Sequence, residues 1–452
     1  MRKDWYYQRI YCIKLGMQKK TPINEQDRRF IERLNQRPDL KSRLEAILEL
    51  AESEGGELRT ADEIEELLIE ELRRLGNQTM QDWASGAHAR VAAEMKKKDP
   101  SCYPGKKKTL KWWCVFGRVE VQESIWRSPS KSYLRVFANR IGVTNRGRSR
   151  RLERVLSDFG SEHSFAKANF RLAEHYGFSL NASAVRRTTL RHAQRAKSQM
   201  ESAYEETFGT LPARGAEHVV AEADGTMICT LQASGRKQKR PREWKEMRLV
   251  AARAQGRIEI TYGATFGSVE TTGRRWGHCA KEAGWGLQSQ IHVVADGAEW
   301  IRLQSREVFG EQERFLLDYF HASEYLADAA ESCRPKASRY WRRVQQKRLK
   351  RGAAASILKE LEEHMEAPNV PDEAAPVRAA RRYLGNRLDQ LDYPRALSLD
   401  LPIGSGLIES GHRHVLQARL KQPGTAWLAE NADAVAQLRV LRANGQWAHL
   451  WN

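Results

Sequence analysis

The sequence predicts a mixed α+β protein made of several domains. Its 452 residues are enough for about three domains of ordinary size. Helix-spaced apolar residues dominate both ends of the chain, whereas the central part alternates between short strand-like runs and helices. Hydrophobic residues make up 41% of the chain, which is enough for packed cores and excludes a wholly disordered protein.

The chain is strongly basic, and its charge is unevenly distributed. Lysine and arginine number 76 against 57 aspartates and glutamates, which gives a net charge of +19. Residues 45–71 contain eleven acidic residues and one basic residue, so this stretch carries −10 and the rest of the chain +29. Such a surplus predicts an acidic partner, of which nucleic acid is the commonest.

Membrane-spanning and secreted proteins are disfavoured. No run approaches the roughly 18 apolar residues of a transmembrane helix. The first residues, MRKDWYYQRIYCIKLG, are basic but lack the apolar core and the small-residue cleavage site of a secretion signal. The six cysteines have no metal-ligand spacing, which indicates free thiols in a reducing compartment; they are Cys12, Cys102, Cys114, Cys229, Cys279 and Cys333.

Residues 1–100 are predicted to form a helical region. Apolar residues such as Phe30 and Leu34 recur at helical spacing from residue 24 onward. Pro38 separates two helices, and Thr60 with Glu63 forms a capping box for a third. We expect this region to assist assembly or DNA-end binding, with an acidic face exposed to solvent.

Two smaller regions follow. Residues 101–140 are predicted to form a small β element, because TLKWWCVFGRVEVQESIWRS alternates around Gly117. Residues 141–205 have the pattern of a helix-turn-helix, with a turn at Gly177 and a basic helix after it. The second helix of this motif lies in the major groove. An ordinary helical hairpin with a basic surface remains the alternative.

Residues 206–330 predict the first part of an α/β domain. Three strand-like stretches are followed by a helix, a strand, a helix and a strand, which is the order of an RNase H-like sheet. Residues 331–394 are charged and helical throughout and predict an all-helical insertion. Residues 395–452 would complete the catalytic core and add a C-terminal helix. We expect Trp427 to lie in that core.

Three carboxylates stand out by their positions. Asp224 lies on or just beyond the first predicted strand, Asp296 at the end of the fourth, and Glu409 near the start of a late helix. The first and fourth strands are neighbours in an RNase H-like sheet, and a helix at its edge can supply the third acid. Two magnesium ions held by such acids can activate the attacking oxygen and stabilise the leaving oxygen of a phosphodiester.

An ordinary structural interpretation of these acids also stays open. Both aspartates precede glycine, and Asp-Gly between apolar strands is a strong hairpin signal, so residues 218–232 can be read as a two-stranded hairpin. A glutamate in the first turns of a helix is also typical of dipole complementarity.

Seven stretches carry a resemblance to a known family: SDFGSEHSFAKANFRLAEHYG (157–177), EADGTMI (222–228), REWKEMRL (242–249), VVADGAEWI (293–301), LLDYFHASEYL (316–326), DYPRALSLDLPIGSGLIES (392–410) and QARLKQPGTAW (417–427). In their order and spacing, the chain resembles the ISKra-type insertion-sequence transposases. These are bacterial DDE-class enzymes that are distantly similar to the Mutator-like group.

The resemblance implies a set of site residues. It assigns the catalytic and metal-binding triad to Asp224, Asp296 and Glu409, with two Mg²⁺ (or Mn²⁺) ions. It also marks Asp318 and His321 as a supporting Asp-x-x-His motif.

Zinc is not expected. Such transposases often carry a paired Cys-x-x-Cys segment before the small sheet, but here the stretch reads SCYPGKK. Cys102 and Cys114 alone cannot complete a tetrahedral zinc site.

DNA-binding residues are expected on three basic stretches: residues 145–154, the helix after Gly177, and the first part of the insertion. The candidates are Arg148, Arg150, Arg151, Arg186, Arg187, Arg191, Arg342, Arg343 and Lys347.

Together, these observations predict a DDE transposase that binds the terminal inverted repeats of an insertion sequence and catalyses cleavage and strand transfer into target DNA. We expect a homo-oligomer, a dimer or larger, in a synaptic complex, and a cytoplasmic, nucleoid-associated location in a prokaryote. The alternatives are a transposase-derived DNA-binding protein without catalytic activity and a stand-alone RNase H-like nuclease.

Overall fold

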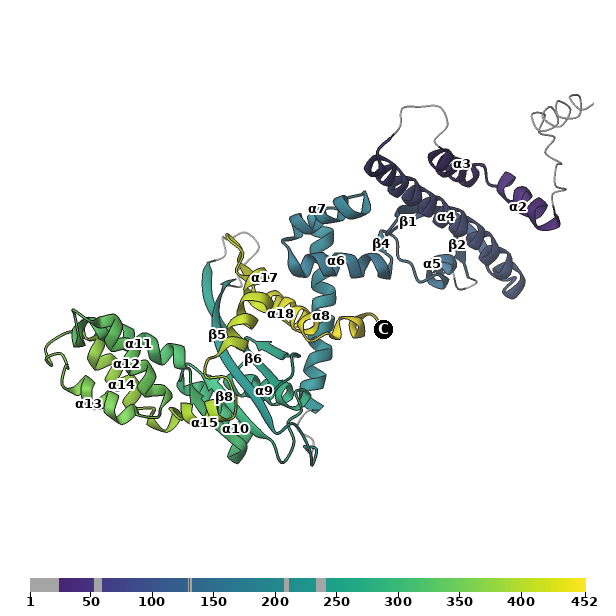
Figure 1. Cartoon of the computed structure of the whole chain (residues 1–452). Helices are drawn as coiled ribbons and strands as arrows, with labels where there is room; N and C mark the ends of the chain where they lie inside the picture. The colour runs from purple at the N-terminus through teal and green to yellow at the C-terminus, as the bar shows by residue number, and fades with distance from the viewer. Residues whose placement is uncertain (1–23, 53–58, 129, 131, 207–210, 233–240) are drawn as a thin grey trace, which may run out of the picture. The chain divides into compact units, whose positions relative to one another are not determined.

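The computed structural model describes residues 24–52, 59–128, 130, 132–206, 211–232 and 241–452 (Figure 1). The chain divides into two compact units. The first consists of Met1–Leu152 and Ala173–Phe178, and the second of Glu153–Leu172 and Ser179–Asn452. The predicted 141–205 region is therefore divided between the two units. Residues 1–23 of the predicted N-terminal region lie outside the described residues.

The first unit contains the predicted N-terminal helices and the small β element. Its helices are α2 (Glu25–Asn35), α3 (Pro38–Glu52), α4 (Ala61–Lys98) and α5 (Val136–Arg140). The Thr60 side chain accepts from Glu63 N, and the Glu63 carboxylate accepts from Thr60 N, so the predicted capping box is confirmed. Ala84, Ala87 and Val91 bury one side of α4 in the core of the unit.

The small sheet of this unit has the order β3-β2-β1-β4. Its strands are β1 (Tyr103–Cys114), β2 (Gly117–Arg127), β3 (Tyr133–Leu134) and β4 (Gly147–Arg148). β1 and β2 form the predicted hairpin, and Gly117 at its turn has φ of +122°, a conformation that favours glycine.

Three helices follow the small sheet, namely α6 (Arg150–Glu162), α7 (Phe165–Tyr176) and α8 (Ala182–Glu206). Gly177, with φ of +68°, forms the predicted turn between α7 and α8. Ala193, Ala196 and Met200 of α8 are buried in the main core of the second unit, which α18 (Ala429–Ala443) also enters. The basic helix is thus packed on one side and free to expose arginines on the other.

The second unit is built on a larger sheet with the order β7-β6-β5-β8-β9, to which a short β10 adds by pairing with β5. β5 pairs antiparallel with β6, and β6 antiparallel with β7, whereas β5, β8 and β9 run parallel. The strands are β5 (His218–Leu231), β6 (Arg242–Ala254), β7 (Thr261–Thr265), β8 (Gln290–Ala295), β9 (Glu313–Leu317) and β10 (Trp427–Leu428).

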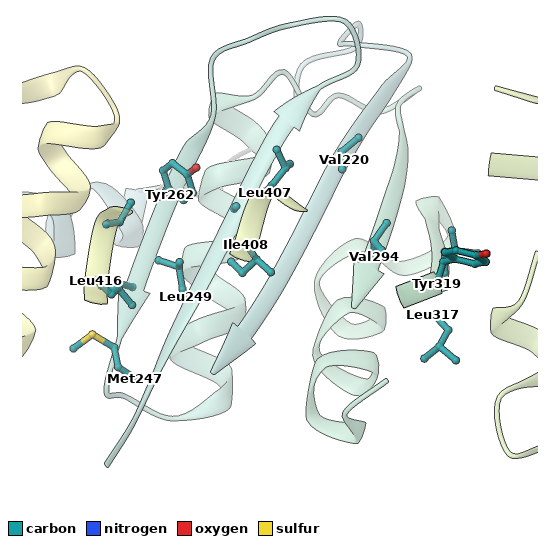
Figure 2. Close-up of a cluster of buried hydrophobic side chains, with 14 of the residues drawn as sticks. Val220, Met247, Leu249, Tyr262, Val294, Leu317, Tyr319, Leu407, Ile408 and Leu416 are labelled. Carbon is teal, nitrogen blue, oxygen red and sulfur yellow. The ribbon is translucent and has the colours of Figure 1, made fainter. Parts of the chain in front are cut away.

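Helices cover both faces of this sheet. Val219 and Ala221 of β5 face α9 (Val269–Glu282) and α10 (Glu299–Phe309) in one apolar cluster. Val220 points to the opposite face, where the larger core contains residues of α8, α18 and α16 (Gly406–Gly411). Figure 2 shows Leu407 and Ile408 of α16 at the sheet, together with Val220 and Leu249. Side-chain alternation along β5 therefore assigns Glu222 and Asp224 to the α16 face.

The predicted insertion is helical, and its helices begin before residue 331. They are α11 (Tyr319–Cys333), α12 (Ser338–Lys350), α13 (Ala354–Glu362), α14 (Pro376–Gly385) and α15 (Tyr393–Ser398), with short 3₁₀ turns at Asp372–Ala374 and Leu388–Gln390. α11 follows β9 directly, so the insertion grows from the same sheet edge as the candidate acids (Figure 1).

The chain ends with α16, a π-helical segment η4 (His412–Gln417), α17 (Ala418–Leu420), β10, α18 and a final 3₁₀ segment (Gln446–Trp451). Trp427 is 7% exposed and lies in the core, as predicted. Across the described ranges, no helix has both the length and the apolar content needed to cross a bilayer. The mixed helix and sheet content confirms the predicted fold class at that level.

Candidate active site

The three parallel strands of the second unit place three aspartates in one row. β5 and β8 pair from His218↔Gln290 to Glu222↔Val294, an offset that next brings Asp224 level with Asp296. β8 and β9 pair up to Ala295↔Leu317, and the next pair in the same register is Asp296 and Asp318. Neighbouring strands lie about 4.8 Å apart. The carboxyl ends of β8 and β9 thus bring Asp296 and Asp318 beside Asp224 of β5.

Asp224 lies within a continuous strand. β5 passes through Asp224 and Gly225 and pairs with β6 along its whole length, from Val219↔Ala254 to Leu231↔Arg242, so the hairpin alternative is wrong at this position. The Asp224 side chain is 44% exposed. Oδ1 accepts a hydrogen bond from Gly225 N, and Oδ2 lies 3.1 Å from His412 Nε2.

Asp296 ends its strand in a turn that leads into α10. Gly297 adopts φ of +80°, which favours glycine, and Asp296 Oδ1 accepts from Ala298 N at 2.9 Å. The Tyr383 hydroxyl of α14 donates to the Asp296 carbonyl at 2.6 Å. The insertion thereby fixes the backbone that carries this acid.

Asp318 is fully buried, and hydrogen bonds occupy both of its oxygens. Oδ1 caps α11 by accepting from Phe320 N and His321 N at 2.6 and 3.0 Å. Oδ2 accepts from Ser405 N and Ser405 Oγ, both at 2.6 Å. A carboxylate has about four acceptor positions, so these donors leave Asp318 without an oxygen for a metal ion.

The charge of Asp318 is maintained by these contacts. Burial acts to raise its pKa, but the hydrogen bonds from His321 and Ser405 outweigh burial and hold the pKa well below its usual range. Asp318 is therefore an anionic anchor between β9, α11 and the loop that precedes α16.

That loop is held at two further points. His292 of β8 approaches the Pro402 carbonyl with Nε2 at 2.7 Å, and Tyr319 N donates to Ile403 O at 2.9 Å. Burial lowers the pKa of His292 to about 4, so its imidazole is neutral at pH 7. In that form Nε2 can donate to Pro402 while Nδ1 accepts from Arg395 at 3.2 Å.

A second buried acid, Glu222, holds the start of α16. Its side chain is fully buried, and Oε2 accepts from Ile408 N at 2.9 Å. Burial raises its pKa to about 8, although this hydrogen bond acts in the opposite direction. The sequence offered one clue that was missed, since Glu222 precedes Asp224 by two residues and so shares its face of the strand.

Glu409 lies on the exposed side of α16 because the opposite side of the helix is packed on the sheet. Leu407 and Ile408 are buried in the core, whereas Glu409 is exposed (Figure 2). The helix approaches the sheet so closely at Gly411 that a Cβ there would lie 2.7 Å from Tyr262 and 2.9 Å from Leu249. Packing therefore fixes the direction in which Glu409 points.

His412 links this helix to Asp224 and was not predicted. It is 5% exposed, follows Glu409 by three residues, and begins the π-helical segment η4. Residues three apart share a helix face, which is the sequence signal that could have identified it. Single π-turns occur often at functional sites.

The three predicted triad residues are not drawn into one metal-binding cluster. Among the described residues, no group of three or more His, Cys, Asp or Glu side chains is close enough to hold an ion. Asp224, Asp296 and Glu409 nevertheless suit Mg²⁺ chemically, because each presents carboxylate oxygens at a partly or fully exposed position. Like charges repel, so without a cation three carboxylates have no reason to converge.

His321 provides a positive group near these acids. Its Nδ1 lies 3.6 Å from Asp318 Oδ1, and its side chain is 43% exposed. The interaction with Asp318 outweighs burial and raises the pKa of His321 to about 9. The imidazole is therefore positively charged at pH 7, with the negative charge of Asp296 adding to the effect.

The predicted DNA-binding residues are mostly exposed. Arg186 and Arg187 lie on the outer side of α8, and Arg191, also exposed, pairs with Glu153. Arg342, Arg343 and Lys347 lie on the exposed side of α12. In the first unit, Arg150 and Arg151 are exposed and Arg148 is half-buried.

Comparison with known proteins gives a partial match. A family described as "Uncharacterised protein family (UPF0236)" matches residues 281–450, which is less than half of the chain. The matched segment contains Asp296, Asp318 and Glu409 and begins after Asp224.

Several curated proteins of Caldanaerobacter subterraneus subsp. tengcongensis are similar over 157 residues at 26% identity. UPF0236 protein TTE0402 and UPF0236 protein TTE2489 are matched over 34% of this chain and over 30% and 32% of their own lengths. A third relative, matched over 31% of its length, has a name that joins eleven designations from TTE0033 to TTE2212. The chain spans about a third of the length of the curated relatives it matches.

Proposed function

We propose that this protein is a DDE transposase, which cleaves and joins DNA at the ends of an insertion sequence with two Mg²⁺ or Mn²⁺ ions. The observation that carries the proposal is the register of β5 and β8, which puts Asp224 and Asp296 at neighbouring positions. Glu409 would complete the site from α16, whose first turn and preceding loop are held by Glu222 and Asp318.

The topology supports an RNase H-like catalytic domain. Three antiparallel strands are followed by two parallel strands added on the other side of the first, in the spatial order third, second, first, fourth, fifth. The helical segment between the second and third acids corresponds to the insertion that the resemblance to ISKra-type transposases implies. The catalytic assignment of Asp224, Asp296 and Glu409 rests on that resemblance together with this topology.

The chemistry follows from the kinds of ligand present. Bound Mg²⁺ ions would supply a deprotonated water or 3′-hydroxyl and stabilise the oxygen that leaves phosphorus. Asp224 and Asp296 would hold both ions, and Glu409 the second. Asp318 would hold the loop that orients α16, and the His321 imidazolium would offer positive charge to a DNA phosphate.

Double-stranded DNA is the partner that the charges favour, both as terminal inverted repeats and as target. The exposed arginines of α8 follow a glycine turn, as in a helix-turn-helix, and α12 presents a second basic surface. The eleven joined designations of one relative are what a repeated, mobile gene would leave in a genome. A protein acting on such DNA would work in the cytoplasm, at the nucleoid.

A homo-oligomer is proposed because two DNA ends must be joined. In the first unit, the helices α2 to α4 expose large apolar side chains, with Phe30 56%, Ile69 53% and Trp83 45% exposed. A groove of about 440 Å³ contains Phe30 and Trp83 together with Arg33 and other arginines. The acidic first half of α4 is complementary in charge to this groove, so a second copy of the chain suits it as a partner.

A plasmid carrying the DNA that flanks this gene tests the function. Purified protein with Mg²⁺ should nick or join the plasmid at inverted ends, while Asp224→Asn and Glu409→Gln should bind the same ends without cutting them. An exposed acid, Asp328, offers a matched control as Asp328→Asn. The proposal fails if wild-type protein binds the ends but leaves them intact with either metal.

A second candidate, a transposase-derived DNA-binding protein without catalytic activity, is favoured by one observation. Asp224 lies against His412, and no three metal-ligand side chains cluster within the described part of the chain. In that case the wild type and the variants would bind DNA equally and would all be inactive.

A further inference from the structure

A cavity of about 450 Å³ in the second unit lies away from the row of acids. α8 contributes Arg186 and Leu190 to its wall, and β5 contributes Leu231. The segment around β10 contributes Trp427, and Arg419 of α17 lies at its inner side. Ligand pockets typically measure about 300–1,000 Å³, so the cavity is large enough for a small polar molecule.

Arg419 is an unusual residue for such a wall, because it is 2% exposed and has no acidic partner of its own. Its guanidinium lies 4.8 Å from the ring centre of Phe165 and 4.6 Å from that of Trp427. Nε donates to Gly160 O at 3.1 Å. In the described part of the chain, no carboxylate lies within ion-pairing distance of Arg419.

The nearest acid is already used by other cations. Glu162 pairs with Arg439 at 2.9 Å and also lies 3.7 Å from Arg442. Burial lowers the pKa of Arg419 to about 10, and Arg439 acts in the same direction. A buried cation without a counter-ion is costly, and its stacking on two aromatic rings offsets only part of that cost.

The cavity lies on the same strand as the first candidate acid. β10 pairs with the end of β5 at Trp427↔Thr230 and Leu428↔Leu231. Thr230 is six residues beyond Asp224 on the same side of β5, a separation of about 20 Å at the rise of a strand. Between them, Lys421 Nζ lies 3.3 Å from Thr226 Oγ1. Positively charged residues thus follow β5 from the acids to the cavity.

We infer that this cavity binds a nucleotide of a single-stranded DNA segment, with its phosphate at Arg186 and Arg419 and its base against the apolar wall. Arginine is suited to phosphate because its planar fork can donate two parallel hydrogen bonds. Leu190, Leu231 and Trp427 provide apolar surface for a base, and contacts of this kind do not depend on sequence. The inference rests on the proposed DNA substrate and names where one strand of it binds.

Fluorescence anisotropy of a fluorescein-labelled, single-stranded 12-mer, measured in EDTA with the full chain, tests the site. Arg186→Gln should weaken binding about ten-fold and reduce the slope of log affinity against log salt by about one. Asn431→Trp, which places a large side chain at the cavity wall, should weaken binding without removing a charge. Arg257→Gln is the matched control, since Arg257 is exposed and follows β6 at the opposite end of the β5–β6 pair.

Two competitors distinguish the possible sources of the phosphate. If a DNA strand is the ligand, unlabelled 12-mer should displace the probe at far lower concentration than dTMP, and inorganic phosphate should be weaker still. Equal competition by inorganic phosphate would overturn the nucleotide assignment. Equal affinity of wild type, Arg186→Gln and Asn431→Trp, with unchanged circular dichroism, would overturn the site.

Failure of this site is separable from failure of the proposed function. Binding in EDTA requires no metal and no cleavage, so an inactive protein can still pass the test. Conversely, cleavage of plasmid DNA by wild-type protein together with unchanged 12-mer binding in both variants would reject the cavity alone.

Discussion

Asp318→Asn is expected to destabilise the second unit and loosen the loop that leads to α16. The substitution keeps the size of the side chain but replaces one acceptor oxygen with an NH₂ group. If the remaining oxygen continues to cap α11, the NH₂ group faces Ser405 N and Ser405 Oγ. The Ser405 hydroxyl can rotate to accept from it, but the Ser405 N–H has no alternative partner at that position.

The magnitude follows from the contacts that are lost. A hydrogen bond to a charged acceptor contributes about 1.5–3 kcal/mol, and a buried donor left without a partner costs about 1–3 kcal/mol. Asp318 and Ser405 are both buried, so solvent cannot replace the lost bond. The free energy of unfolding should therefore fall by about 3–5 kcal/mol, the range found when a buried charge loses its partner.

Urea denaturation followed by circular dichroism measures this change. Asp328→Asn on the exposed side of the same helix is the control, and it should lie within about 0.5 kcal/mol of wild type. Ser405→Ala, which removes only the hydroxyl donor, should fall between the two. A loss below about 1 kcal/mol for Asp318→Asn, with the helix content unchanged, would refute the role of Asp318 as an anchor.

Two further predictions concern pH and assembly. His292 has its pKa lowered to about 4 by burial, so its contribution is present above pH 6.5 and is lost as the pH falls through 4; the advantage of wild type over His292→Gln in unfolding free energy should shrink by about 3 kcal/mol between pH 7 and pH 4. Parallel pH dependence of the two proteins would contradict the buried neutral imidazole. Trp83→Glu should shift sedimentation toward the monomer, whereas Trp244→Glu, at an equally exposed tryptophan of the second unit, should not. Identical sedimentation of both variants and wild type would reject the α2–α4 surface as the interface.

The positions of the two aspartates could be predicted because strand pairing is regular. The 72 residues between Asp224 and Asp296 equal the register offset of β5 and β8, and the 22 residues between Asp296 and Asp318 equal that of β8 and β9. Recognising the ends of the parallel strands was therefore enough to align these residues. The turn at Gly177 and the capping box at Thr60 depend on local sequence and were predicted for the same reason.

The supporting contacts could not be predicted because they join segments far apart in the chain. Asp318 and Ser405 are 87 residues apart, and Glu222 and Ile408 are 186 residues apart. Local patterns also misled at Asp224-Gly225, where a hairpin signal is overridden by pairing along the whole of β5. The division between the two units after Leu152 depends on how α8 packs with α18, which helical periodicity does not reveal.

The central claim is that Asp224, Asp296 and Glu409 cut DNA together while Asp318 only supports them. Single-turnover cleavage of an element end, at saturating protein and Mg²⁺, compares Asp224→Asn, Asp296→Asn, Glu409→Gln and Asp328→Asn directly. The first three should each lose at least about 1,000-fold in rate with unchanged DNA affinity, and the control should match wild type. Cleavage by any of the three within ten-fold of the wild-type rate would contradict the account.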